Sequence, residues 1–160
     1  MRIADLCNRH VATCERSASA ADVARLMRAQ HAGEVIVVDT VGGIQMPVGL
    51  LTDRDLVVEV MGAGLDPEAV TAGDLMAETV VTVYESEDVQ DAIWHMHTKA
   101  IRRLPVVDYT NRLRGIVVLD DIAAFLGSAL TDLARIAPRQ KTVEKSRRSA
   151  ETIETPATPA

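Results

Sequence analysis

Two pairs of short apolar runs divide the chain into halves with the same pattern. The first pair is Val35–Val38 and Val48–Leu51, and the second is Leu104–Val107 and Leu113–Val118. Turn residues separate the runs of each pair, so each pair predicts a β-hairpin.

Each hairpin lies between two predicted helices. An amphipathic helix is expected before it, capped by Ser19 in the first half and by Asp88 in the second. A closing helix is expected after it, beginning at Asp53 or at Leu119. The predicted order of each half is β-α-β-β-α, since runs of strand-forming residues precede the amphipathic helices. These runs are Val11–Cys14 and Val80–Val83.

Comparison of the two halves reveals an internal repeat. A shift of 69 positions places residues 37–39 on 106–108, and a shift of 66 places Asp55 on Asp121. We therefore expect an α/β (α+β) fold with one repeat in residues 1–65 and the other in residues 70–130. Units of about 60 residues bury too little surface to be comfortably stable alone, so the repeats are expected to pack on each other.

The repeated pattern stops at Pro138. Residues 138–160 contain few apolar residues and many Ser, Thr, Pro and charged residues. Such a segment cannot bury enough surface to offset its chain entropy, so we predict a disordered tail. Its basic residues could contact RNA, a membrane or a partner, but a solvated tail is the preferred interpretation. They are Arg139, Lys141, Lys145, Arg147 and Arg148.

Composition narrows the classes of function. Aromatic residues make up 2% of the chain, which argues against sites that stack nucleic-acid bases on aromatic rings. The net charge of −6 argues against binding to duplex nucleic acid. The sequence lacks an apolar run of the length of a signal peptide or a membrane span. We expect a cytoplasmic protein with neither nucleic-acid nor membrane partners.

Three segments resemble the CBS domain: DLM at 74–76, RRLPVVD at 102–108 and GLLTDRD at 49–55. Because related segments recur in order at matching offsets, residues 1–130 resemble a tandem CBS pair, or Bateman module. The resemblance implies two repeats packed sheet to sheet with pseudo-twofold symmetry. It also implies a regulatory module, without catalysis of its own, that binds an adenosine-containing ligand in a cleft between the repeats: AMP, ADP, ATP, S-adenosylmethionine or NAD.

The segment from Thr52 to Asp55 has the chemistry that such a ligand needs. The Asp55 carboxylate can accept hydrogen bonds from ribose hydroxyls, and the Thr52 hydroxyl can add another. Arg54 and the amides of a helix N-terminus favour a phosphate. Alternatively, Thr52 or Asp53 only caps the helix. The nucleotide-binding residues implied by the resemblance are Leu51, Thr52, Asp53, Arg54, Asp55, Met76, Val81, Arg102, Arg103 and Pro105.

Arg102 and Arg103 occupy the positions at which the family contacts phosphate. Adjacent side chains on a strand point to opposite faces, so one of the two at most is expected in the cleft unless the chain bends there. A solvated pair at a strand edge is the alternative. Val81 and Met76 fall where the family lines its adenine pocket, and ordinary core packing is the favoured interpretation of their side chains.

The second cleft is expected to be degenerate. Asp121 repeats Asp55, but Val118 replaces the hydroxyl of Thr52. Asp120 replaces Arg54, and Glu34 stands where the other repeat has Arg103. Each loss of a charge-assisted bond costs about 1.5–3 kcal/mol. We predict that this cleft, with Val118, Asp121, Ala12 and Glu34, is empty or takes a ligand without phosphate.

Other candidate sites are weaker. Cys7 and Cys14 align with apolar positions of the second repeat, so we interpret them as structural and predict no metal site. Trp94 and His97 lie beside Ile93 and Met96, which suggests a homodimer surface extended by the closing helix. That helix would contribute Ile122, Phe125 and Leu126.

Three classes of function remain. The favoured one is a sensor of AMP, ADP or ATP, with S-adenosylmethionine or NAD(H) as alternative ligands. It needs no cofactor and acts through an effector protein that the sequence does not identify. An enzyme is disfavoured because the chain shows no nucleophile–base pair, P-loop or metal cluster. A structural adaptor with vestigial clefts is the third class.

Overall fold

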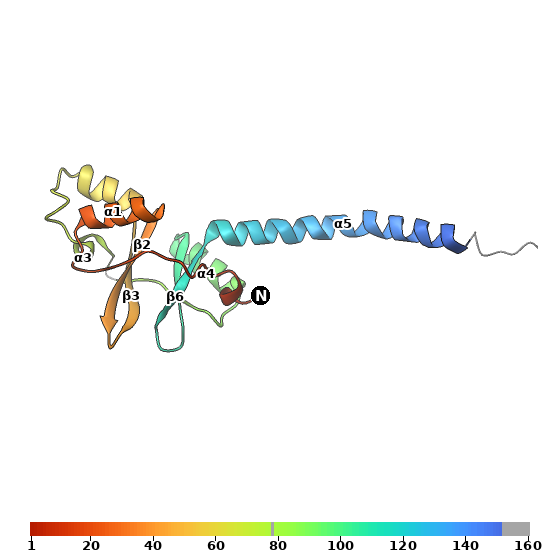
Figure 1. The fold of residues 1–160 in the computed structure, drawn as a ribbon, viewed down its shortest axis with the longest axis horizontal. Coiled ribbons are helices and arrows are strands. Elements are labelled where there is room, and N and C mark those ends of the chain that lie inside the picture. The colour runs from red at the N-terminus through yellow and green to blue at the C-terminus, as the bar shows by residue number, and fades with distance from the viewer. Residues whose placement is uncertain (78, 152–160) are drawn as a thin grey trace, which may run out of the picture. The chain divides into compact units, whose positions relative to one another are not determined.

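The computed structural model describes residues 1–77 and 79–151 (Figure 1). It divides into two compact units, Met1–Ile122 and Ala123–Ala160. The described part of the first unit contains two three-stranded sheets, with strand orders β1-β2-β3 and β4-β5-β6. This mixed α/β architecture confirms the predicted fold class.

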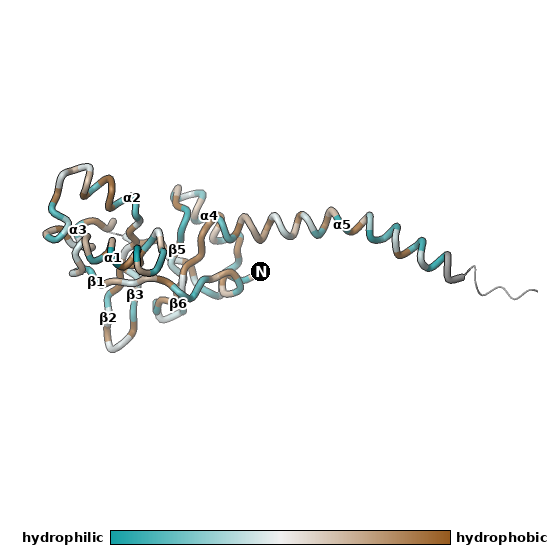
Figure 2. Tube along the Cα trace, turned by 45° about the horizontal axis from the view of Figure 1, so that its top comes forward, coloured by the Kyte–Doolittle hydropathy of each residue, from teal (hydrophilic) through white to brown (hydrophobic). Residues whose placement is uncertain are grey.

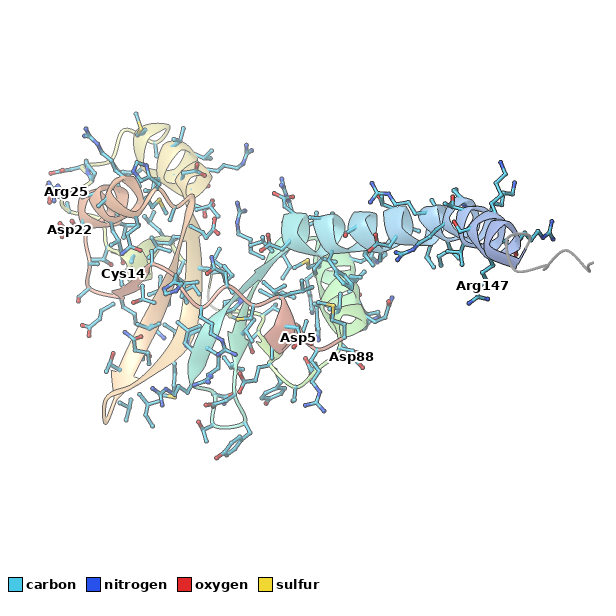
Figure 3. All side chains as sticks on the ribbon, turned by 45° about the vertical axis from the view of Figure 1, so that its right-hand side comes forward. Asp5, Cys14, Asp22, Arg25, Asp88 and Arg147 are labelled. Carbon is cyan, nitrogen blue, oxygen red and sulfur yellow. The ribbon has the colours of Figure 1, made fainter. Side chains whose placement is uncertain are left out.

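The first sheet contains β1 (Thr13–Glu15), β2 (Glu34–Val41) and β3 (Ile44–Thr52). β1 runs parallel to β2, and β2 pairs with β3 as an antiparallel hairpin. α1 (Ala20–Gln30) connects β1 to β2, and Ser19 caps it as predicted, since its side chain accepts from the Asp22 N–H. Asp22 also pairs with Arg25 on the same helix, at 2.7 Å (Figure 3).

The second sheet repeats this arrangement with β4 (Val83–Tyr84), β5 (Arg103–Val107) and β6 (Leu113–Val118). α4 (Val89–Lys99) connects β4 to β5. Asp88 is its N-cap, as predicted, and its N–H donates to the Asp91 carboxylate at 3.0 Å.

Irregular features of the backbone also recur in both repeats. The pairing register shifts between Val37 and Val38 in one hairpin and between Val106 and Val107 in the other. Both connecting helices end on a left-handed residue, His31 and its counterpart Ala100. The repetition therefore extends to turns and bulges, and it relates the two halves by a pseudo-twofold.

An apolar cluster joins the two sheets. Its buried members are Ile36 and Val38 of β2 and Ile116 of β6. A backbone bridge adds to this contact, because Asn8 and Ile116 each donate an N–H to the other's carbonyl at 2.9 Å. The partly buried side chains around the cluster are Val11, Leu50, Leu113 and Val118.

The two opening turns are exchanged between the repeats. η1 (Ile3–Asp5) places the fully buried Ile3 in the core of the second sheet. α3 (Ala72–Leu75) places the fully buried Ala72 in the core of the first. The Ile3 N–H donates to the Glu87 carbonyl, and the Ala72 N–H donates to the Ala18 carbonyl. The predicted repeats, residues 1–65 and 70–130, instead assign each of these turns to its own copy.

The closing helices begin where predicted but differ in length. In the first repeat, α2 (Asp53–Asp55) continues as the π-helical segment η2 (Leu56–Met61). In the second repeat, α5 extends from Leu119 to Glu151. Among the described residues, we find no helix with both the length and the hydropathy of a membrane span.

The prediction of a disordered tail is wrong for residues 138–151, which continue α5. Helical hydrogen bonds form within the segment itself, so a helix needs no burial to satisfy its backbone. The segment also contains strong helix formers such as Gln, Lys, Glu and Arg. Pro138 lies inside the helix. The rest of the predicted tail, residues 152–160, lies outside the described part of the chain.

Candidate functional site

A cavity of about 520 Å³ lies between the two repeats. This volume is within the usual range for small-molecule sites. One wall comes from the end of β3 and the start of α2, and the other from residues 77, 79–81, 100–103 and 105 of the second repeat. The lining residues are Gly49, Leu50, Thr52, Asp53, Arg54, Ala77, Thr79, Val80, Val81, Ala100, Ile101, Arg102, Arg103 and Pro105.

Thr52 and Asp55 form a capping box at the start of α2. The Thr52 N–H and hydroxyl both donate to the Asp55 carboxylate, at 2.7 and 2.8 Å, and the Asp55 N–H donates back to the hydroxyl at 3.3 Å. Thr52 lines the cavity, while Asp55 lies outside its lining. In this structure the Asp55 carboxylate therefore orients the Thr52 hydroxyl through a hydrogen bond, and Asp53 is the carboxylate that lines the cavity.

Two further predicted residues, Leu51 and Met76, also lie outside the lining. Leu51 is 1% exposed and belongs to the core of the first repeat. Met76 packs against the same core, beside Gly49. Residue alternation explains Leu51, because its neighbours Leu50 and Thr52 line the cavity. The exchange of the opening turns explains Met76.

Arg102 and Arg103 both line the cavity. The expectation that only one could enter assumed that both lie on a strand, but β5 begins at Arg103. The Arg102 backbone is held differently, since its carbonyl accepts the Leu119 N–H at 2.8 Å. Both arginines thus contribute to the wall of the cavity between the repeats.

Arg103 forms an ion pair with Glu34, its own counterpart in the first repeat. Its Nε donates to a Glu34 carboxylate oxygen at 3.0 Å, and both side chains are partly buried. Arg102 has a longer ion pair with Asp120, at 3.7 Å, and both of these side chains are exposed. The Arg103–Glu34 pair links the two repeats and must compete with any anion for Arg103.

The second cleft is a smaller cavity of about 240 Å³. Shifting the lining of the first cavity by 69 or 66 positions gives most of its residues, so the two cavities are equivalent by repetition. The predicted Ala12 and Glu34 are among them. The lining residues are Asn8, His10, Val11, Ala12, Gln30, His31, Ala32, Gly33, Glu34, Ile36 and Ile116.

The counterparts of Thr52, Asp53 and Arg54 line a separate hollow of about 190 Å³. Val118 and Asp120 lie there together with Arg102 and Arg103, which reach their carboxylate partners at this point. Asp121 lies outside the linings of both hollows. The second cleft is thus divided, and its two carboxylates, Glu34 and Asp120, are paired with Arg103 and Arg102. The first cavity is continuous and has three arginines and one carboxylate, Asp53, in its lining.

Motif matching missed the cavity residues that carry no distinctive side chain. Ala77, Val80, Ala100 and Ile101 belong to loops whose composition is unremarkable. Their signal lies in the repeat, because their counterparts at a shift of 69 line the second cavity. A sequence comparison of the halves around a known cleft residue could therefore have found them.

The cysteines have a structural environment. Burial raises the pKa of the Cys7 and Cys14 thiols above its usual range. A thiol with a raised pKa is a poor nucleophile and a poor metal ligand at neutral pH. Within residues 1–77 and 79–151, no group of three His, Cys, Asp or Glu side chains is placed to hold a metal ion.

The CBS domain family model matches residues 3–62 and 72–128. The chain belongs to the CBS domain family. The two matched segments correspond to the two structural repeats, so this protein contains a CBS domain pair.

Curated relatives share the CBS sequence over most of this chain. An uncharacterized protein of Methanopyrus kandleri is 38% identical over 120 residues, which are 75% of this chain and 60% of that protein. The CBS domain-containing protein YhcV of Bacillus subtilis is 32% identical over 138 residues, 82% of this chain and 94% of YhcV. The match to the first relative thus spans about three fifths of its length.

Solved structures share the fold of the CBS pair. Hypoxic Response Protein I with two coordinated zinc ions has a TM-score of 0.67 and 31% identity, covering 78% of this chain and 98% of that one. The CBS domain protein of Pyrobaculum aerophilum complexed with AMP has a TM-score of 0.68 and 21% identity, covering 76% and 89%. The CBS pair of protein MJ0100 with 5′-methylthioadenosine and S-adenosyl-L-methionine has a TM-score of 0.70 and 24% identity, covering 81% and 98%.

The ion pair between Arg103 and Glu34 gives a testable effect on affinity. Replacing Glu34 by glutamine should raise the affinity of this cavity for a phosphate-bearing ligand about fivefold, or by ~1 kcal/mol, because Arg103 then loses its competing carboxylate. Isothermal titration calorimetry measures the change. Asp39→Asn is the matched control, since it removes the ion pair with Arg16 on an exposed surface outside the cavity. A lower affinity in Glu34→Gln would show instead that Glu34 orients Arg103 for the ligand.

Proposed function

We propose that this CBS pair is a regulatory module that senses an adenine nucleotide, AMP, ADP or ATP, in the cavity between its repeats. The apolar part of the lining, including Val81 and Pro105, would hold the adenine ring. The Thr52 hydroxyl would bond the ribose, with Asp55 as its positioning residue. Arg54, Arg102 and Arg103 would contact the phosphates.

The charge of the cavity lining is the observation that supports this choice of ligand. Three arginines and one aspartate line it, so an anionic ligand gains more there than a cationic one. S-adenosylmethionine bears a sulfonium and an ammonium group, which disfavour it beside the arginines. The neighbours with bound AMP or S-adenosyl-L-methionine are both under 25% identical to this chain. Their similarity therefore supports the fold and does not indicate which ligand this cavity binds. The ligand is therefore argued from the lining residues.

The first cavity is proposed as the one competent nucleotide site. The second cleft is smaller, is divided by two ion pairs, and has Asp120 and Glu34 where the first has Arg54 and Arg103. Phosphate would meet carboxylates there. We therefore expect one nucleotide for each chain.

Signalling would proceed through a homodimer and an effector protein in the cytoplasm. Trp94 is 59% exposed on α4 and supports a contact between copies. The predicted surface is smaller than the sequence suggested, because Met96 and Ile122 are buried in the core of the second repeat. A ligand that fixes the angle between the repeats would change the arrangement of the dimer, provided that it binds two such arrangements with different affinities.

Calorimetric titration of the full chain with AMP, ADP, ATP, NAD, NADH and S-adenosylmethionine tests the proposal. We expect one site for each chain, affinity that rises with the number of phosphates, and the weakest binding for S-adenosylmethionine. Two equal sites would contradict the proposed asymmetry. Tightest binding of S-adenosylmethionine would contradict the phosphate contacts, and absence of binding to all six would favour an adaptor.

Chromatography of ATP after incubation with the protein separates a sensor from an enzyme. We expect the nucleotide to be recovered unchanged, because the cavity lining contains no pair of a nucleophile and a general base within the described residues. Appearance of ADP or AMP in proportion to protein concentration would contradict a purely regulatory role.

A further inference from the structure

The described part of the second unit, residues 123–151, is the single helix α5, which has no core of its own. From Leu126 to Val143, the large apolar side chains of α5 are solvent-exposed, with Leu130 at 67%, Leu133 at 63% and Ile136 at 59%. A helix owes most of its stability in proteins to the packing of one face, so a long exposed helix of this kind calls for a partner.

The apolar residues of this helix follow a heptad repeat. Positions a are Leu126, Leu133 and Gln140, and positions d are Ala129, Ile136 and Val143. The a and d positions form the seam of a coiled coil, and Leu130 at position e widens the apolar stripe on one side. The tube of α5 alternates between hydrophobic and hydrophilic colours along its turns (Figure 2). We refer to these six residues as the seam.

The residues that weaken a helix lie away from the seam. Gly127 is at position b and Pro138 at position f, the position farthest from a partner helix. Among the hydroxyls that bond back into the helix, those of Thr131 and Thr142 are at f and c, and that of Ser146 lies beyond Val143, at g. The seam is therefore continuous from Leu126 to Val143, and Arg147 ends it at the next a position (Figure 3).

Polar residues around the seam define a register with a second copy. In a parallel pair, Gln140 of each chain shares one layer with its counterpart, and a single buried amide at position a is a known device for fixing register. Arg139 at position g then lies opposite Glu144 at position e of the other chain, and the attraction occurs twice by symmetry. Ile136, Arg139, Gln140, Val143 and Glu144 already share one face of the helix.

A membrane surface fits this helix less well. Interfacial helices need a broad apolar face with aromatic or Leu anchors. Beyond Ile136, α5 offers Val143 as its one apolar seam residue between many charged side chains. In a single chain, the Gln140 amide donates to the Glu144 carboxylate at 3.1 Å, which leaves this end of the seam strongly polar.

We propose that α5 associates with α5 of a second copy as a parallel, in-register coiled coil through the seam from Leu126 to Val143. The geometry makes this helix a self-association surface that is independent of the nucleotide cavity. It would bring two CBS pairs together whether or not a ligand is bound.

Disulfide trapping in the full chain tests both the partner and the register. Ala129→Cys places a thiol at a d position, where the two copies meet in a parallel pair. We expect it to form a covalent dimer under mild oxidation at micromolar concentration, at least tenfold faster than Ser128→Cys and the unsubstituted chain. Ser128→Cys is the matched control, because position c faces away from the seam. Equal rates for the two variants would overturn the proposal.

A second measurement tests whether the seam mediates association at all, whatever the relative orientation of the two helices. Leu133→Lys should lower the apparent association constant of the ligand-free chain at least tenfold in sedimentation experiments, whereas Thr131→Lys at position f should not. An unchanged association constant in Leu133→Lys would overturn the proposal. Binding of the monomeric chain to anionic phospholipid vesicles, lost in Leu133→Lys, would assign the seam to a lipid surface and would also overturn it.

Discussion

Replacing Arg54 by aspartate should lower the affinity for ATP about 100-fold. The substitution copies Asp120, which occupies the equivalent position of the second repeat. It removes one charge-assisted contact and adds repulsion between a carboxylate and the phosphates, together about 2.8 kcal/mol. Arg54 is an exposed residue at the cavity wall, so the folded structure should tolerate the change. Calorimetric titration with ATP gives the affinity.

Arg28→Asp is the control for the change in net charge. Arg28 is exposed on α1 and lies outside the cavity lining, so its replacement alters the same overall charge without touching the ligand. We expect an effect of less than threefold on ATP affinity, since charges beyond about 10 Å are largely screened at moderate salt. Equal losses in both variants would mean that overall charge, rather than contact with Arg54, governs binding.

Replacing Gly115 by alanine should destabilise the CBS pair by about 3 kcal/mol. A Cβ atom at this position would meet the Asn8 carbonyl oxygen and the Cys7 sulfur well inside van der Waals contact. The obstacle is backbone, and it belongs to the bridge in which Asn8 and Ile116 exchange hydrogen bonds. The alanine must therefore shift a strand or break the bridge. A melting temperature about 10 °C lower, measured by calorimetry, is the expected result.

Gly127→Ala controls for the general effect of replacing a glycine. An added Cβ at Gly127 has open space around it, and alanine favours a helix by about 1 kcal/mol over glycine. We expect the main melting transition to stay within about 2 °C of that of the unsubstituted chain. An unchanged transition in Gly115→Ala would show that the N-terminal segment can move away from β6 at little cost.

The sequence predicted the elements of the fold well because the signals were local. Ser19 and Asp88 cap their helices, and the apolar runs form the two hairpins. The exchange of opening turns could not be predicted, since it depends on which of two similar cores a short turn reaches. The helix beyond Pro138 was missed because burial was treated as necessary for order, whereas helical hydrogen bonds are local.

The site shows the same division between local and long-range information. Repetition relates Ala12 and Glu34 to Val81 and Arg103, and these residues line equivalent cavities in the structure. It could not show that Arg103 and Glu34 pair with each other, because that contact joins different repeats. A motif also gives residue types without directions, which is why Asp55 belongs to the capping box and lies outside the cavity lining.

The exchanged opening turns bear on how a chain of this kind could have arisen and how it folds. Each repeat completes its core with a turn that belongs to the other copy, Ile3 in one direction and Ala72 in the other. Two separate chains of one repeat each would make the same contacts by lending their first residues to one another. Gene duplication and fusion would then convert an intertwined dimer into a single chain without changing a contact. Neither half of the present chain should acquire its native core before the other half is made.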